Sequence, residues 1–144
     1  MAGPRGEVNE MVFEEGVVLS EPFDEATASV KASLAESGYG TLSEIDVQAT
    51  LREKLDKQIG RFVIIGACNP SLAGRALDVE PEVGVLLPCN VVLREIDGDK
   101  VLVEAMDPGL IATLSGNEEL RPIIDESRRL LGAALNRLSP VAVV

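Results

Sequence analysis

The sequence predicts an α+β fold: a mainly antiparallel sheet of about five strands packed against helices, in a single domain with a long C-terminal helix. Three observations predict this class. Short segments alternate apolar and polar residues or run continuously apolar, as strands do. Two longer segments repeat apolar residues at helical spacing. The predicted order β-α-β-(α)-β-α-β-β-α mixes hairpins with helical crossovers, which differs from the regular alternation of a doubly wound sheet. At 144 residues the chain fits one domain, expected over 10–144 after a flexible lead-in at 1–9.

The first strand is expected near residues 10–19, where the alternation is imperfect. A helix then starts at Pro22, because proline is favourable in a first helical turn. Its end is expected at Gly38, since glycine readily adopts the left-handed conformation that closes a helix. One apolar stripe supports this helix: Phe23, Ala26, Thr27, Val30 and Leu34.

Residues 41–48 predict a second strand, with a bulge near Ser43 because Leu42 is out of phase with the apolar residues that follow. The side chains on its polar face are expected to be Glu44, Asp46 and Gln48. A short helix is predicted over 49–57.

The run from Phe62 to Cys68 predicts a central strand that ends at Asn69-Pro70. A short helix over 71–78 follows, and then the longest strand signal, 83–96. Pro88 lies within that signal and marks a bulge or an edge, because proline cannot donate to a sheet ladder. Asp97-Gly98-Asp99 predicts a hairpin turn into a last strand over 100–106.

Asp107 precedes Pro108 and is expected to cap a further helix, which Ser115-Gly116-Asn117 interrupts. The long final helix is predicted from one stripe: Leu120, Ile123, Ile124, Ser127, Leu131, Ala134, Leu135 and Leu138.

The charge balance argues against several partners. There are 13 basic and 24 acidic residues, a net charge of −11, which disfavours binding to nucleic acid and to anionic membranes. Aromatic residues make up only 3% of the chain, so no base-stacking platform is expected. Neither a membrane-spanning run nor a signal peptide is predicted. With two cysteines and no export signal, we expect a soluble protein with free thiols in the cytoplasm.

The chain has no histidine, and this absence removes many kinds of catalytic site. Ser-His-Asp and Cys-His machinery is excluded, as are histidine-ligated zinc, iron and haem. No glycine-rich phosphate motif occurs, so no nucleotide cofactor is expected. The sequence favours a non-enzymatic role and leaves the question of catalysis open.

Four phrases together resemble the domain-of-unknown-function 302 family. They are the segments 44–51, 66–70, 86–91 and 105–108, and the resemblance covers the region from about residue 10 to 138. The resemblance implies a compact α+β fold with a mainly antiparallel sheet, and self-association. It implies no activity, because that of the family is unassigned.

The two cysteines are the first candidates for chemistry. Cys68 and Cys89 each precede an asparagine, and they would lie close together if their strands are neighbours. Such a pair can form a disulfide, carry a sulfane sulfur or bind a soft metal. The alternative is that both are small buried hydrophobic side chains, as free cysteines usually are. Cys68 is the better candidate nucleophile, because a helix is expected to begin directly after it.

Polar residues in the same phrases are candidate ligand-binding residues: Asp46, Gln48, Asn69 and Asn90. Glu44 and Asp46, on one strand face, would lie about 7 Å apart, a spacing that suits acid and base roles or a water-bridged cation, or simply a solvated face. Asn69 also fits a turn, and Asn90 would need hydrogen-bond partners if its strand is buried.

Three hypotheses of function follow. The first is a homodimeric binding module with an apolar pocket for a small molecule, without metal or cofactor. The second is a thiol-based redox or sulfur-handling protein that uses Cys68 and Cys89. The third is an acidic protein–protein interaction domain. The sequence identifies neither the ligand nor the physiological partner.

Overall fold

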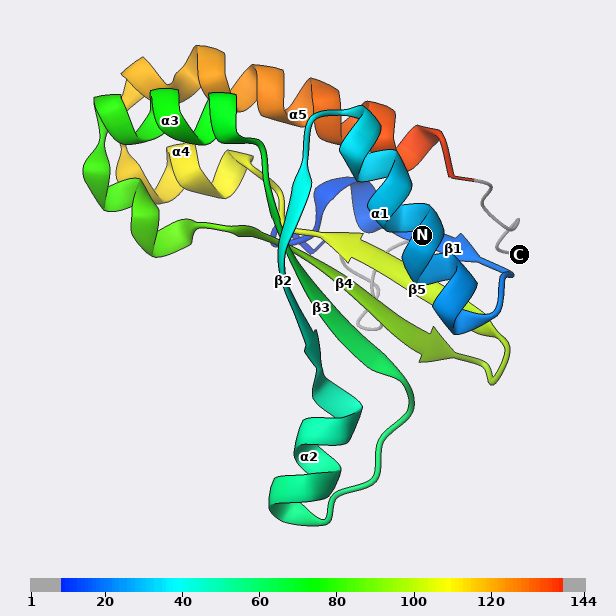
Figure 1. The fold of residues 1–144 in the computed structure, drawn as a ribbon. Helices are drawn as coiled ribbons and strands as arrows, with labels where there is room; N and C mark the ends of the chain where they lie inside the picture. The colour runs from blue at the N-terminus through cyan, green and yellow to red at the C-terminus, as the bar shows by residue number, and fades with distance from the viewer. Residues whose placement is uncertain (1–8, 139–144) are drawn as a thin grey trace.

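The computed structural model describes residues 9–138, which form short strands and helices (Figure 1). The strands are β1 (Val17–Leu19), β2 (Gly40–Asp46), β3 (Phe62–Cys68), β4 (Cys89–Ile96) and β5 (Lys100–Ala105). The helices are α1 (Phe23–Glu36), α2 (Val47–Leu55), α3 (Pro70–Val79), α4 (Gly109–Ser115) and α5 (Arg121–Asn136). The described residues also form the 3-10 helices η1 (Phe13–Glu15), η2 (Pro81–Leu86) and η3 (Glu118–Leu120).

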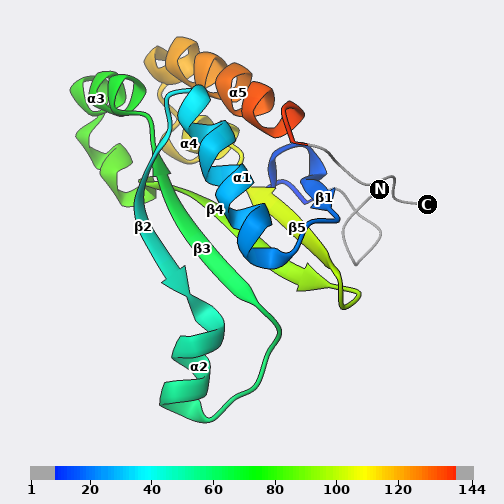
Figure 2. The ribbon, with the colours of Figure 1, turned by 45° about the vertical axis from the view of Figure 1, so that its right-hand side comes forward.

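The five strands form one antiparallel sheet in the order β1-β5-β4-β3-β2. Strands β2 to β5 follow one another as a meander, and α1 carries the chain from β1 at one edge to β2 at the other. Helices α1 and α5 lie over the same face of the sheet (Figures 1 and 2). The α+β class and the mainly antiparallel sheet are therefore confirmed.

The first hydrophobic core lies between the sheet and helices α1 and α5. Alternate strand residues enter it, as the period of two requires. Those without exposed surface include Leu19, Ile65, Leu93 and Val103. The opposite face of the sheet carries half-buried Ile64 and other apolar residues, and an ion pair between Arg94 Nε and Glu104 Oε1 at 3.3 Å.

A second hydrophobic core lies at one end of the sheet, in what we call the helical lobe (residues 69–87 and 107–127). It is built from α3, η2, α4, η3 and the first half of α5, which together carry Leu72, Ala76, Val83, Ile111, Leu120, Ile123 and Ile124. The C-terminal half of α5 packs in the first core, so this one helix joins the two cores (Figure 1).

The first strand is shorter than predicted. Phe13–Glu15 is a 3-10 turn, and the chain reverses through positive φ angles at Glu14, Glu15 and Gly16 before β1. The prediction of a strand over 10–19 was wrong in its first half, because this turn buries Phe13 in the sheet core without any pairing in a strand.

The second strand ends at Asp46, and the expected strand residue Gln48 lies instead in α2. Asp46 Oδ1 accepts a hydrogen bond from the Ala49 amide at 2.9 Å. This carboxylate therefore caps the helix and ends the strand. The predicted bulge is confirmed: the register with β3 shifts between Thr41 and Ser43.

Residues 83–96, which were predicted as one strand, belong to two elements. Pro81–Leu86 is a 3-10 helix, and β4 begins only at Cys89, so Pro88 precedes the strand instead of interrupting it. Gly66 on β3 accommodates this proline, because a side chain at Gly66 would lie 2.9 Å from Pro88 Cγ and closer still to Ser43. Asn90 is exposed, contrary to the buried position considered for it.

The other elements follow the predictions closely. The helix after Pro22, the strand Phe62–Cys68, the hairpin at 97–99 and the long final helix are all present. Asp107 Oδ1 accepts a hydrogen bond from the Gly109 amide at 2.8 Å. Asp107 thus binds the first amide of α4 from one residue before the N-cap, which is Pro108, so the helix begins one residue later than predicted. Within residues 9–138, no helix combines the length and the apolar character needed to cross a membrane.

Candidate functional site

The candidate site is a cavity of about 50 Å³ inside the helical lobe, at the ends of β3 and β4. Apolar side chains from α3, α4, η3 and α5 form most of its wall, among them Leu72, Ile111, Leu120 and Ile123. The polar groups at the cavity are few and come from distant parts of the chain: Tyr39, Cys68, Asn69, Cys89 and Ser127.

The two cysteines meet here because β3 and β4 are neighbours. Cys89 begins β4 opposite Ala67, so its side chain lies on the sheet face that α1 and α5 cover. Cys68 follows Ala67 as the last residue of β3 and lines the same cavity. Both are free thiols. Burial raises the pKa of Cys89 to about 11, and the neighbouring Cys68 thiolate acts in the same direction.

Cys68 lies directly before the N-cap residue of α3. Asn69 Oδ1 accepts a hydrogen bond from the Leu72 amide at 3.2 Å, which makes Asn69 this N-cap. The Asn69 Nδ2 group donates to the Ser37 carbonyl at 3.4 Å, so this side chain also joins α3 to the end of α1. The expected helix start after Cys68 is present, and Asn69 has the structural role of a cap at the cavity wall.

Tyr39 and Ser127 complete the polar side of the cavity. The Tyr39 hydroxyl shares a hydrogen bond of 2.7 Å with Ser127 Oγ. Burial raises the pKa of Tyr39, the hydrogen bond with Ser127 opposes this change, and the charges of Cys89 and Cys68 add to it. The polar side of the cavity thus carries a neutral phenol and two thiols, and most of the remaining wall is apolar.

The remaining candidates, Asp46, Gln48 and Asn90, do not line the cavity. Asp46 caps α2, and Gln48 Nε2 donates to the Ile59 carbonyl at 3.1 Å within the same projecting segment. Glu44 forms an ion pair with Lys31 of α1. Glu44 and Asp46, which the predicted strand alternation placed on one face, therefore make separate structural contacts. Among residues 9–138 there is no group of three or more carboxylates or thiols arranged to hold a metal ion.

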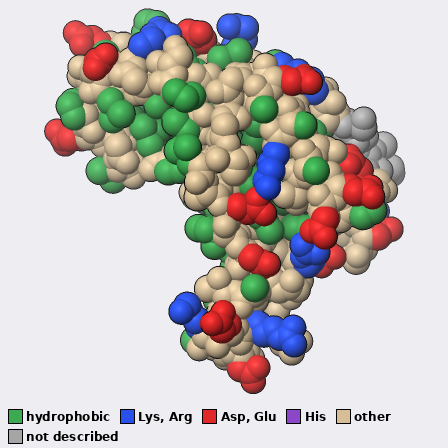
Figure 3. Space-filling view, in the orientation of Figure 1, with side chains coloured by type: hydrophobic (Ala, Val, Ile, Leu, Met, Phe, Trp, Pro, Cys, Tyr) green, Lys and Arg blue, Asp and Glu red, His purple; other side chains and the backbone are tan. Residues whose placement is uncertain are grey.

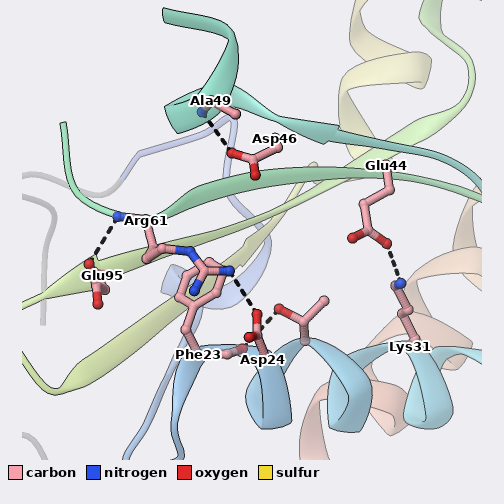
Figure 4. A network of polar contacts seen from close by, with 9 residues as sticks. Phe23, Asp24, Lys31, Glu44, Asp46, Ala49, Arg61 and Glu95 are labelled. Atoms are coloured by element: carbon pink, nitrogen blue, oxygen red, sulfur yellow. Dashed lines mark hydrogen bonds and ion pairs between the residues drawn. The ribbon is translucent and has the colours of Figure 1, made fainter. Parts of the chain in front are cut away.

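A second polar cluster in Figure 4 also has a structural role. Arg61 Nη2 lies 2.7 Å from Asp24 Oδ1, and its backbone amide donates to Glu95 Oε1 at 2.9 Å. Its guanidinium stacks over Phe23, with 4.4 Å to the ring centre. These contacts join the start of β3 to the start of α1. The ion pair is solvent-accessible, so it belongs to the surface and not to an enclosed site.

Sequence reasoning missed Tyr39 and Ser127 as site residues. A signal was present for Ser127, since it is a hydroxyl within the apolar stripe of the final helix. Tyr39 is the single tyrosine of the chain and follows the glycine that ends α1. Nothing in its local pattern indicates a partner 88 residues away.

The comparisons agree with the arrangement of strands and helices. The family model described as "Domain of unknown function DUF302" matches residues 16–138. The chain belongs to the DUF302 family. This DUF302 chain is also similar to a crystal structure of an uncharacterized conserved DUF302 protein from Bacillus stearothermophilus, with 26% sequence identity and a TM-score of 0.79. That match covers 88% of this chain and 99% of the other. No curated protein matches the chain. The family assignment gives no function.

Proposed function

We propose that this DUF302 protein is a homodimeric binding module that holds a small, mostly apolar molecule in the cavity of the helical lobe. The cavity itself carries this proposal, because apolar walls with a few placed polar groups are the usual composition of a small-molecule site. A reducing cytoplasm is the compartment that fits the proposal, since both thiols at the wall then stay free.

The volume of the cavity limits the size of the ligand. Pockets for drug-sized molecules span roughly 300–1,000 Å³, whereas this cavity has about 50 Å³. The ligand that fits has only a few heavy atoms, or inserts a short apolar end and leaves the rest outside. The Tyr39 hydroxyl and the two thiols supply the polar contacts that would orient it.

Native mass spectrometry of the freshly purified protein, beside a denatured control, tests this proposal. A dimer that retains a small molecule which denaturation releases is the expected result. Xenon serves as a defined probe of the cavity, because small apolar cavities bind it. Xenon is expected to shift the NMR signals of Ile111 and Ile123, which line the cavity. Ala76→Leu should abolish these shifts by filling the space.

Ala32→Leu is the matched control, because it adds the same atoms on the exposed side of α1 and should leave xenon binding intact. Xenon shifts that persist in Ala76→Leu, or that never appear in the unmodified protein, would contradict a binding cavity at this place.

A second function is favoured by one specific observation, the two thiols at one cavity. Here Cys68 receives sulfur from a low-molecular-weight persulfide. The Cys68 thiolate attacks the outer sulfur, the S–S bond of the donor breaks, a new S–S bond forms on Cys68, and the donor leaves as a thiolate. No external oxidant is needed, because the sulfane sulfur only changes its carrier. Cys89, with its raised pKa, would stay protonated at neutral pH and lie beside the product.

Alkylation separates the two functions. A thiol that acts as a nucleophile must react readily in the folded protein, so rapid alkylation of Cys68 would favour sulfur transfer. Cys68→Ser should abolish persulfide loading and leave xenon binding nearly unchanged. Resistance of both thiols until the protein unfolds would exclude sulfur transfer and leave the binding module in place.

A further inference from the structure

The segment that returns from β2 to β3, residues 47–61, projects from the body of the molecule and is here called the arm (Figures 1 and 2). None of the nine residues of α2 is buried. Leu55 is 68% exposed. It lies one helical turn from the half-exposed Leu51, so the two share one side of the helix. The helix has a capped start at Asp46 and a left-handed end at Asp56, yet its apolar side packs on little within the described part of the chain.

A short helix without a buried face needs a packing surface to be stable. Isolated helices shorter than about 12–15 residues are marginal in water, because few hydrogen bonds offset the cost of ordering the chain. Most helical stability in proteins comes from packing of an apolar face. The nine residues of α2 are thus expected to gain stability from a surface outside the chain.

The arm has a charge opposite to that of the molecule. It carries four basic residues, Arg52, Lys54, Lys57 and Arg61, against Glu53 and Asp56, so its net charge is +2. The whole chain has a net charge of −11, which leaves −13 on the rest. Within residues 9–138, Arg52, Lys54 and Lys57 form no ion pair, so their charges are available to a partner.

The helical lobe offers the complementary surface. It exposes apolar side chains at Leu77, Val85 and Leu114, with Val85 86% exposed. Its basic residues, Arg75 and Arg121, pair with Glu126 and Glu118, and Arg128 just beyond it pairs with Asp107. Within residues 9–138, the lobe carboxylates that form no ion pair are Asp78, Glu80, Glu82, Glu119 and Asp125. Figure 3 shows hydrophobic side chains gathered over the lobe, with acidic and some basic ones at its edge, and a hollow between the lobe and the arm.

We propose that the arm of one copy docks on the helical lobe of a second copy, so that two reciprocal arm–lobe contacts close a two-fold dimer. This inference rests on the self-association within the proposed function and names the surfaces that make it. A two-fold axis repeats each contact, so a single complementary pair of surfaces is used twice. Apolar Leu55 would meet the exposed apolar side chains of the lobe, and the basic residues of the arm would meet its carboxylates.

A second copy is favoured over an unrelated acidic partner because both halves of the contact are present on one chain. The arm is basic and apolar, and the lobe is acidic and apolar. They lie on either side of the hollow in Figure 3, where one copy's arm cannot fold back onto its own lobe without leaving β2 and β3. The dimer would therefore place the partner's arm beside the lobe that contains the cavity.

A charge-exchange experiment on the full chain tests this. One variant reverses the arm (Arg52→Glu with Lys54→Glu), and the other reverses the lobe (Asp78→Lys with Glu82→Lys). Each alone places like charges at both contacts and is expected to weaken the dimer on the order of 100-fold or more, because juxtaposed like charges at an interface strongly disfavour association. In an equimolar mixture, a dimer of one arm variant and one lobe variant has complementary charges at both contacts, so heterodimers should form. Sedimentation velocity and native mass spectrometry measure both results.

Arg129→Glu, an exposed reversal on α5 outside both surfaces, is the control and should leave the dimer unchanged. Restoration in the mixture cannot arise from misfolded variants, since two misfolded chains would not recover one another. An unmodified protein that stays monomeric would overturn both the dimer and its interface. A dimer that resists both reversals would support self-association but show that the arm and the lobe do not form the interface.

Discussion

The two cores of this protein differ in how completely they are packed. In the sheet core, Leu19, Ile65, Leu93 and Val103 have no exposed surface, because strand pairing fixes each side chain against α1 and α5. In the helical lobe, the elements are short helices joined by loops, and most core residues keep a small exposed fraction. The cavity lies in this second core.

The difference indicates that the lobe is where the fold has room for a ligand. The regular hydrogen bonding of a sheet fixes the positions of its side chains closely. Short helices pack at angles that depend on the neighbouring loops, so small spaces can remain between them. The candidate site residues lie beside the lobe. Cys68, Cys89, Tyr39 and Ser127 collect at the joint between the two cores, while the sheet core is built almost entirely from apolar side chains.

The largest expected effect on the free energy of unfolding comes from truncating core side chains. Leu93 is fully buried in the sheet core, and Ile123 lines the cavity of the lobe. Leu93→Ala should lower the free energy of unfolding by about 4 kcal/mol, as truncation in a closely packed core does. Ile123→Ala should lower it by only about 2 kcal/mol, because a residue beside an existing space loses fewer contacts. Urea denaturation monitored by circular dichroism measures both values. Equal losses would show that the two cores are packed alike and would remove the basis of the comparison.

The second effect concerns pH. The pKa of Cys89 is about 11 in the folded protein against 9.0 for an unperturbed thiol, so between these values the unfolded chain loses a proton that the folded chain keeps. The folded state then binds more protons, and the free energy of unfolding falls as pH rises, by about 2 kcal/mol across that window. Denaturation at pH 8 and at about pH 11 measures the loss.

Cys89→Ala should remove most of this pH dependence, and the raised pKa of Tyr39 leaves a smaller decline at still higher pH. Leu93→Ala, which removes no titratable group, should keep the full slope. A Cys89→Ala protein with an unchanged slope would mean that Cys89 is accessible to water in the folded state.

A third effect concerns the polar side of the cavity, where Tyr39 and Ser127 share a hydrogen bond. Tyr39→Phe removes this bond and should lower the free energy of unfolding by about 1 kcal/mol. Ser127→Ala should cost less, because the Tyr39 hydroxyl can still donate to the Ser127 carbonyl at 3.3 Å. The double variant should cost less than the sum, because both changes remove the bond to Ser127 Oγ. Additive losses in thermal or urea denaturation would show that the two hydroxyls act independently.

The smallest effects are expected for surface ion pairs, and here too the regions differ. Arg75 Nη1 lies 3.1 Å from Glu126 Oε2 in the lobe, with both side chains substantially exposed. Exposed pairs of this kind contribute little, so Arg75→Ala should change the free energy of unfolding by only about 0.5 kcal/mol. On the sheet side, the Arg61 side chain also stacks on Phe23. Arg61→Ala should therefore cost more, about 1 kcal/mol. Urea denaturation measures both, and a larger loss for Arg75→Ala would indicate that the lobe depends on its surface charges.

Much of the fold could be predicted from local patterns. Apolar periodicity located α1, β3 and α5, and turn residues located the hairpin at 97–99. The boundaries failed where two tendencies competed. At Asp46 the strand alternation continued to Gln48, but the carboxylate capped a helix instead. At Pro88 an apolar segment resembled a strand although part of it forms a 3-10 helix in the lobe.

The candidate site could be predicted only in part. Cys68, Asn69 and Cys89 were selected because one cysteine-asparagine phrase ends a predicted apolar strand and the other lies inside one, and the structure places all three at one cavity. Asp46, Gln48 and Asn90 were selected by the same kind of pattern and lie elsewhere. The sequence could not separate the two sets, because alternation tells which side chains share a face and not what covers that face.

By itself, the sequence determined the fold class, the presence of only two cysteines, the absence of histidine chemistry and the acidic balance of the chain, because these follow from composition and from periods of a few residues. Only the tertiary structure decided that Tyr39 and Ser127, 88 residues apart, share a hydrogen bond beside Cys68 and Cys89. It also decided that the basic arm stands apart from an acidic lobe. Such contacts depend on how α3, α4 and α5 pack at the end of the sheet, and no local pattern encodes that arrangement.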